Sequence, residues 1–163
     1  MPIVLQMTRK LALRPTPPEL SGIRLRHYAG PQDIETWLDI RRRAFARQKV
    51  GISDWDSSDF HREFLSKPWW RPEVMWLAET EPLLMPTSAV GTVTLARRGD
   101  KPVVHWLCVA PGNRRQGVGR LLLTTLEAAA WDIDERQIWL ETHTAWSEAL
   151  RLYESLGYRP VEG

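Results

Sequence analysis

A chain of 163 residues is long enough to bury a core and has the size of a single domain. Its 22 Lys and Arg and 20 Asp and Glu residues leave a net charge of +2 with the two signs interleaved, which argues against a nucleic-acid partner. No apolar run reaches the length of a membrane span, and the single cysteine excludes an internal disulfide and is typical of the reducing cytoplasm.

Residues 1–22 are predicted to form an N-terminal arm or linker ahead of one domain over residues 23–163. The Pro-rich segment Arg14–Pro18 cannot lie in a central strand or in the interior of a helix. The residues before this segment are expected to add at most an edge strand.

Residues 23–27 alternate apolar and basic side chains, which predicts a half-buried strand. Gly30 and Pro31 open a helix that extends to about residue 47, and Asp56 or Ser57 caps a second helix. The basic run of the first helix, residues 41–43, is expected to lie mostly on the solvated side of that helix.

The second half of the chain is predicted to hold strands at 74–78, 89–96, 103–109, 137–141 and 158–161, and helices at 117–133 and 145–156. Strand 103–109 is apolar on both faces, as expected of a central strand. The order β-α-α-β-β-β-α-β-α-(β) predicts a fold of the α/β (α+β) class, with a mixed sheet and helices on both faces.

The most informative stretch joins strand 103–109 to the following helix through the spacing Arg114-x-x-Gly117-x-Gly119. The first N–H groups of a helix are unpaired and carry partial positive charge, so they suit a phosphate group. Glycines let the backbone come close to such a ligand. Arginines add positive charge that pairs with phosphate oxygens: Arg114, Arg115 and Arg120. The stretch therefore predicts a pyrophosphate site.

Two other kinds of glycine turn fit less well. A Walker loop needs Lys and then Ser or Thr after its last glycine, and Gly119 is followed by Arg120. A dinucleotide-binding turn would match Gly117-x-Gly119, with Glu141 as the acidic residue that binds the ribose. However, Leu122 stands where that turn needs its third glycine.

Three motifs in order resemble the GNAT superfamily of acyl-CoA-dependent N-acyltransferases: Leu107-x-Val109-x-Pro111, Arg114-x-x-Gly117-x-Gly119 and Tyr153-x-x-x-Gly157-Tyr158. The resemblance implies a mostly antiparallel mixed central sheet and acetyl-CoA as co-substrate, with no metal. It further implies transfer of an acetyl group to a primary amine of a small molecule or a peptide N-terminus. The alternative is a non-catalytic acyl-CoA-binding module that senses the cofactor or scaffolds a partner.

By that resemblance, the backbone amides near Gly117 would cradle the pyrophosphate of coenzyme A. The backbone of strand residues 107–109 would pair with the pantetheine arm, where two parallel strands splay apart. The cofactor-binding residues implied in this way are Leu107, Cys108, Val109, Arg114, Arg115, Gln116, Gly117, Val118, Gly119 and Arg120.

Tyr153 aligns with the tyrosine that many family members place near the CoA sulfur, so we expect it to act as an acid toward the leaving thiolate. A helix tyrosine packed in the core is the structural alternative. His105 and Glu141 are two candidates for the base that deprotonates the amine. Strand alternation places His105 on the face of Leu107 and Val109. Each candidate base also fits a structural role, as a core histidine or a solvated carboxylate.

Three tryptophans are candidates for the acceptor pocket. Trp55 and Trp70 lie near several aspartates and would form an aromatic, acidic cleft for a cationic amine, unless those acids are only a solvated helix start. Trp146 stands where many family members have an Asn, so the pantetheine contact of that Asn is in doubt and Trp146 is expected to wall the pocket. Strand alternation points Cys108 away from His105, which favours direct attack by the amine over an acyl-cysteine.

The C-terminus is short and departs from the family pattern, because the usual final hairpin strand is expected to be missing. Residues 3–13 or a second subunit would complete that edge of the sheet, so a homodimer is one of two expectations. Neither a nucleic acid nor a membrane is expected as a partner.

Overall fold

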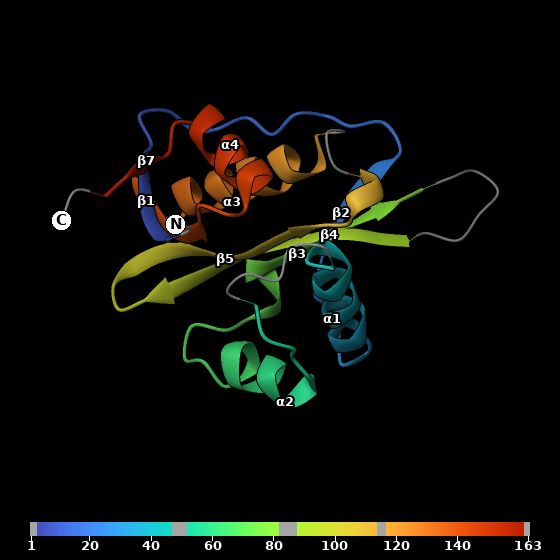
Figure 1. The fold of residues 1–163 in the computed structure, drawn as a ribbon. Coiled ribbons are helices and arrows are strands. Elements are labelled where there is room, and N and C mark those ends of the chain that lie inside the picture. Colours follow the sequence, from blue (N-terminus) through green and yellow to red (C-terminus); the bar gives the residue numbers. More distant parts are fainter. Residues whose placement is uncertain (1–2, 47–51, 82–87, 114–116, 162–163) are drawn as a thin grey trace.

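A computed structural model describes residues 3–46, 52–81, 88–113 and 117–161. Its core is a seven-stranded sheet in the order β2-β3-β4-β5-β6-β1-β7 (Figure 1). The strands are β1 (Val4–Lys10), β2 (Ile23–His27), β3 (Met75–Thr80), β4 (Ser88–Arg98), β5 (Lys101–Val109), β6 (Gln137–His143) and β7 (Arg159–Pro160). Every neighbouring pair is antiparallel except β5 and β6, which are parallel. The mixed, mostly antiparallel sheet expected from the sequence is confirmed.

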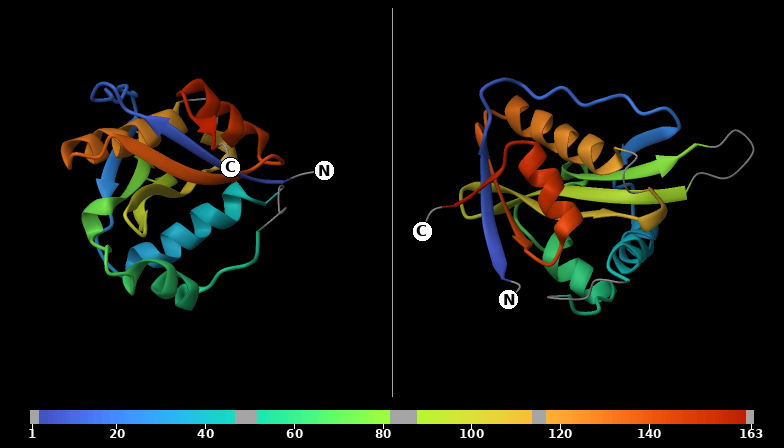
Figure 2. Two further views of the ribbon diagram at one scale, coloured as in Figure 1. Left: turned by 90° about the vertical axis from the view of Figure 1, so that its left-hand side faces the viewer. Right: turned by 45° about the horizontal axis from the view of Figure 1, so that its top comes forward.

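The helices cover the two faces of this sheet. They are α1 (Gln32–Ala44), α2 (Ser57–Phe60), the π-helix η1 (His61–Leu65), the short 3₁₀ helices η2 (Pro72–Val74) and η3 (Pro111–Asn113), α3 (Val118–Asp132) and α4 (Ser147–Ser155). Figure 2 shows α3 and α4 on one face of the sheet and α1 and α2 on the other. The predicted helices are in place: Pro31 opens α1 as expected, and of the two predicted caps of α2 it is Asp56 whose side chain accepts from the first backbone N–H groups.

Each face of the sheet has its own core. The α3 core lies between the sheet and helices α3 and α4, and its buried side chains include Met7, Leu95, Val104, Leu122, Leu126, Leu140, Tyr153 and Tyr158. The α1 core lies between the sheet and helices α1 and α2, and its buried side chains include Ile34, Trp37, Leu38, Phe60, Phe64, Met75, Leu77 and Cys108. The sheet is thus apolar on both faces where helices cover it.

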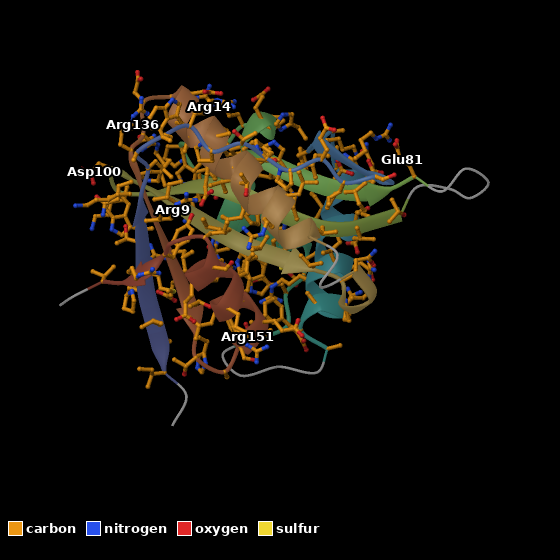
Figure 3. The ribbon with its side chains drawn as sticks, turned by 90° about the horizontal axis from the view of Figure 1, so that it is seen from above. Arg9, Arg14, Glu81, Asp100, Arg136 and Arg151 are labelled. Carbon is orange, nitrogen blue, oxygen red and sulfur yellow. The ribbon has the colours of Figure 1, made fainter. Side chains whose placement is uncertain are left out.

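Strand β1 completes the edge of the sheet beside β6, which agrees with the expectation that residues 3–13 fill this edge. It pairs with β6 from Val4 opposite His143 to Lys10 opposite Gln137, and β7 pairs on its other side. Met7 is buried in the α3 core, which anchors this strand on the helix-covered face. Residues 11–22 then run along α3, where Arg14 pairs with Asp132 at 2.9 Å (Figures 1 and 3). The domain boundary at residue 22 stays a prediction.

A buried polar cluster ties β1, α3 and the C-terminal segment together. The fully buried Glu127 of α3 accepts hydrogen bonds from the Tyr158 hydroxyl at 2.8 Å and from Arg9 of β1 at 2.7 Å. Burial raises the pKa of Glu127, and the positive charge of Arg9 opposes that rise. Tyr158 is therefore held in place beside the α4 residue Tyr153.

The basic run of α1 lies mostly on the solvated side, as expected, and Arg41 is the exception. The side chains of Arg42 and Arg43 are 67% and 40% exposed, whereas Arg41 is 5% exposed as a residue. Arg41 follows Ile34, Trp37 and Leu38 at helical spacing, so it falls on the side of α1 that packs against the sheet.

Candidate functional site

A cleft of about 850 Å³ opens where β5 and β6 stop pairing. These two parallel strands are paired only at Val103 with Trp139 and at Val104 with Leu140. Beyond Val104 they diverge, and the cleft reaches the turn before α3 on one side and α4 on the other. The sequence expectation of two splayed parallel strands is met by this geometry.

The turn before α3 has the features of an anion site. Gly117 has a φ of +86°, in the left-handed region that favours glycine, and it caps α3. A Cβ at Gly119 would lie 3.0 Å from Leu152 Cδ2, so this glycine lets α3 approach α4 closely. Both glycines line the cleft, at the end of α3 where N–H groups lack helical partners. Arg120 also lines it and donates a hydrogen bond to Ser155 Oγ at 2.9 Å.

The other predicted cofactor-binding residues divide into three groups. Leu107, Cys108 and Val109 line the cleft. Val118 is buried in the α3 core and does not line the cleft with its side chain. Arg114, Arg115 and Gln116 lie outside the described residues.

A β-bulge in β5 changes which side chains share a face. Thr92 of β4 lies opposite Cys108 and Thr94 lies opposite His105, so one residue of β4 faces two residues of β5. At this bulge Trp106 has a φ of +54°. Leu107 packs against the α3 core, whereas the His105 and Trp106 rings lie beside each other on the side of the α1 core. The expectation that His105 shares a face with Leu107 and Val109 is wrong, because the extra residue shifts the alternation.

Tyr153 projects from α4 into the cleft and is 6% exposed. Its ring stands edge-on to Tyr158, with 5.9 Å between the ring centroids. Burial raises the pKa of the Tyr153 hydroxyl far above its usual value, and the nearby Cys108 thiol adds to that rise. The hydroxyl is therefore a neutral hydrogen-bond donor throughout the physiological range of pH.

His105 lines the cleft beside Phe64, with 5.4 Å between the ring centroids. Burial, with a smaller contribution from the positive charges of Arg98 and Lys67, lowers the pKa of His105 to about 4. The imidazole is therefore neutral at pH 7, so one of its ring nitrogens is an acceptor.

The depressed pKa of His105 predicts a loss of stability in mild acid. Because the folded-state pKa of about 4 lies below the ordinary value of 6.5, the unfolded chain binds more protons between these values. The free energy of unfolding should fall by up to about 3 kcal/mol from this group as the pH drops from 6.5 to 4. Urea unfolding of wild type and His105→Gln across this range should show a shallower decline in the variant. Replacement of the exposed His61 by Gln should leave the wild-type slope, and equal slopes for wild type and His105→Gln would contradict the prediction.

Glu141 lies at the edge of the cleft on β6, beyond the last residue pair with β5. Its carboxylate accepts a hydrogen bond of 2.6 Å from Gln6 Nε2 of β1 and lies 3.8 Å from Arg98 Nη1 of β4. Gln6 and Arg98 also line the cleft, and neither was predicted from the sequence. The sequence predicted an edge strand that contains Gln6. It did not show which residue of β6 would lie opposite Gln6.

The aromatic side of the cleft differs from the predicted one. Phe45 lies between Trp106 and Trp146, with ring centroids 5.8 Å and 5.3 Å from it, and all three rings line the cleft. Trp55 and Trp70 are not among the lining residues. They are used for packing: Trp55 stacks on Trp37 at 5.5 Å, and Trp70 stands edge-on to Tyr28 at 5.2 Å.

A family model described as an acetyltransferase (GNAT) domain matches residues 71–160, the segment that builds most of the cleft. The chain belongs to the GNAT acetyltransferase family. The family resemblance carried by the three motifs is thereby confirmed. Within the described parts of this GNAT chain, no helix is long and apolar enough to cross a membrane, and no three His, Cys, Asp or Glu side chains are grouped as metal ligands.

The GNAT chain is similar to curated proteins that are longer than it is. Mycothiol acetyltransferase of Thermobispora bispora is 34% identical over an alignment of 160 residues that covers 94% of this chain and 52% of that protein. Mycothiol acetyltransferase of Mycobacteroides abscessus is 30% identical over an alignment of 158 residues that covers 94% of this chain and 51% of that protein. The chain spans about half the length of these curated relatives.

Solved structures share the GNAT fold. The GCN5-related N-acetyltransferase of Sphaerobacter thermophilus superposes with a TM-score of 0.78 at 21% identity and covers 97% of this chain and 48% of that chain. The ribosomal-protein-S18-alanine N-acetyltransferase of Escherichia coli superposes with a TM-score of 0.60 at 21% identity, over 83% of this chain and 76% of that chain. At these identities the likeness is one of fold.

Proposed function

We propose that this chain transfers an acetyl group from acetyl-CoA to a primary amine by direct attack of the amine. The observation that carries the proposal is the cleft at the divergence of β5 and β6, lined by Gly117 and Gly119, by Tyr153, and by Glu141. An anion site, a neutral donor and a carboxylate are the three kinds of group that this reaction uses.

The residues of the cleft fit acetyl-CoA as a co-substrate. The first-turn N–H groups of α3, with Arg120 beside them, would bind the pyrophosphate. The backbone of residues 107–109 would pair with the pantetheine arm along the edge of β5 that β6 has left. When bound, acetyl-CoA supplies the thioester carbonyl that the amine attacks. Arg151 of α4, which sequence reasoning missed, also lines the cleft and adds positive charge (Figure 3).

The amine must be neutral to attack, and an amine with a pKa near 10.4 costs about 4–5 kcal/mol to deprotonate at pH 7. We assign the base to Glu141, directly or through a water molecule, because its carboxylate attracts an incoming ammonium group at the edge of the cleft. The neutral His105 accepts a hydrogen bond from the amine and orients its lone pair. The nitrogen then bonds to the carbonyl carbon, the C–S bond breaks and the thiolate leaves. The nitrogen loses its second proton to solvent water, which gives the neutral amide.

Tyr153 acts on the leaving thiolate as a hydrogen-bond donor. Because its pKa is raised, the hydroxyl keeps its proton more firmly than an exposed tyrosine does. It therefore stabilises negative charge on sulfur mainly through a hydrogen bond, and the backbone of residues 107–109 donates to the developing oxyanion.

Thiol release from acetyl-CoA tests the proposal, with a panel of small amines and short peptides as acceptors and mass spectrometry of the products. Acetylated product in at least one acceptor is the expected result. Tight binding of CoA without turnover on any acceptor would contradict the proposal and favour a non-catalytic acyl-CoA-binding module.

The assignment of the base predicts the effect of Glu141→Gln. With an active acceptor, kcat/KM should fall about a hundredfold at pH 7, because the amide cannot accept a proton. Measured at pH 9, where more of the amine is neutral, the deficit should shrink. Glu154→Gln removes a charge from the exposed face of α4 outside the cleft and should leave kcat/KM unchanged. A larger loss in His105→Gln than in Glu141→Gln would move the base to His105.

The class of acceptor is part of the proposal. The relatives named mycothiol acetyltransferase favour a small-molecule amine, at 34% and 30% identity. A peptide N-terminus stays the second member of the panel. The cytoplasmic location and the homodimer also stay predictions.

A further inference from the structure

Arg41 of α1 occupies an unusual position for a cation. Its guanidinium carbon lies 4.4 Å from the ring centroid of Trp55 and 4.6 Å from that of Trp106, so the group contacts two indoles that stand edge-on to each other, with 5.3 Å between their centroids. Arg41 Nη1 donates to the Ser53 carbonyl at 2.9 Å. Among the described residues Arg41 has no ion pair within 4.0 Å, and its buried Nε has no hydrogen-bond partner.

Such a site is unfavourable for a residue whose only task is to stabilise the fold. A desolvated charge without an ion pair in contact is costly to bury, although the negative charges of Asp54 and Asp59 act on Arg41 from a greater distance. Apolar residues of similar volume often stabilise a protein at such positions. Burial lowers the pKa of Arg41, which reflects the same desolvation. Two desolvated cation–π contacts offset part of this cost, and both involve rings that Arg41 holds at a defined distance.

Trp106 is the ring that connects Arg41 to the cleft. Its φ of +54° is rare for a bulky residue and persists only where the surroundings hold it. Three further rings contact the Trp106 ring: Trp55 at 5.3 Å, Phe45 at 5.8 Å and His105 at 5.8 Å. Its Nε1 is buried with no hydrogen-bond partner among the described residues, so ring contacts rather than a hydrogen bond orient it.

The conformation of Trp106 decides what residues 107–109 present to the cleft. The bulge adds one residue to β5 between the pairs Thr94–His105 and Thr92–Cys108. If Trp106 returned to an extended conformation, the register would slip and the side chains that follow would change faces. The backbone groups proposed to pair with pantetheine would then turn away from the cleft.

We propose that Arg41 is a positioning residue that clamps Trp106 and thereby holds the β5 bulge in the shape that binds and activates acetyl-CoA. This inference rests on the proposed acetyl transfer. It adds a residue outside the cleft lining, on a helix that sequence analysis expected to present its basic run to solvent.

The test replaces Arg41 by Met, which keeps most of the volume and removes the charge. The expected result is a folded protein that melts within about 5 °C of wild type. Its Kd for CoA, measured by calorimetry, should rise about tenfold, and its kcat should fall about tenfold to a hundredfold, because small displacements of reacting groups are costly. Arg41→Lys retains a cation without the planar stacking surface and should restore part of both losses. Arg42→Met, on the exposed side of the same helix, should behave as wild type.

A double-mutant cycle separates positioning from packing. Glycine adopts positive φ without strain, so in a Trp106→Gly background the clamp has no ring to hold. Arg41→Met should then cause no further rise in the Kd for CoA. The inference would be overturned if Arg41→Met raised the Kd for CoA equally in the wild-type and Trp106→Gly backgrounds. It would also be overturned if Arg41→Met kept the wild-type Kd and kcat, or if both Arg41 variants unfolded. If wild type binds CoA but acetylates no acceptor, the proposed acetyl transfer fails. A Kd for CoA that Arg41→Met raises in wild type but not in Trp106→Gly would still support the positioning role of Arg41.

Discussion

Gly117→Glu should abolish the binding of CoA while the fold persists. The carboxylate would stand at the N-terminus of α3, where the phosphate charge is expected, and repel it. Any side chain also strains the φ of +86° by about 1–2 kcal/mol, although a Cβ there would meet only Leu20 at an ordinary 3.4 Å. We expect the Kd for CoA, measured by calorimetry, to rise at least about a hundredfold, equivalent to about 2.7 kcal/mol.

Gly99→Glu provides a matched control. Gly99 has a φ of +65° in the turn between β4 and β5, and a Cβ there would have no atom within 4 Å, so the substitution brings the same charge and a similar backbone strain. It lies outside the cleft lining, and CoA should bind as to wild type. Equal weakening by both substitutions would show that strain, not charge at α3, is responsible. Full binding by Gly117→Glu would refute the anion site.

Tyr153→Phe should lower kcat about a hundredfold with little change in the Kd for CoA. The hydroxyl is the only difference between the two side chains, and the ring packing against Tyr158 is retained. Its loss removes the donor proposed to stabilise the leaving thiolate, which is an interaction of the transition state rather than of the bound co-substrate. Steady-state kinetics with an active acceptor, together with calorimetry, measures the two quantities separately.

Tyr158→Phe is the contrasting variant. Its hydroxyl donates to the buried Glu127 at 2.8 Å and does not line the cleft. Removing it leaves a buried carboxylate with one donor fewer, which should cost about 1–3 kcal/mol of stability and leave kcat near the wild-type value. Wild-type kcat in Tyr153→Phe would remove the tyrosine from the mechanism and leave it as a packing residue.

Local signals in the sequence were sufficient for the elements and the anion site. The alternation of residues 23–27, the cap at Asp56 and the glycine turn at Gly117 each depend on neighbours within a few positions, and each lies where it was expected. The family followed from motifs of the same local kind, carried by residues such as Val109, Gly119 and Tyr153. Backbone preferences and helix ends are short-range properties, so one chain segment is enough to reveal them.

Tertiary structure alone decided the composition of the acceptor side. Gln6 meets Glu141, 135 positions later in the chain, because β1 pairs with β6, and no local pattern sets that register. The bulge at Trp106 reversed the face of His105, since one extra residue in β5 shifts every later side chain. Arg41 belongs to a basic run that was expected to be mostly solvated, yet it lies buried against two indoles, because the side of a helix that meets the sheet depends on the residues that the sheet places beneath it. Long-range pairing and packing decide these positions.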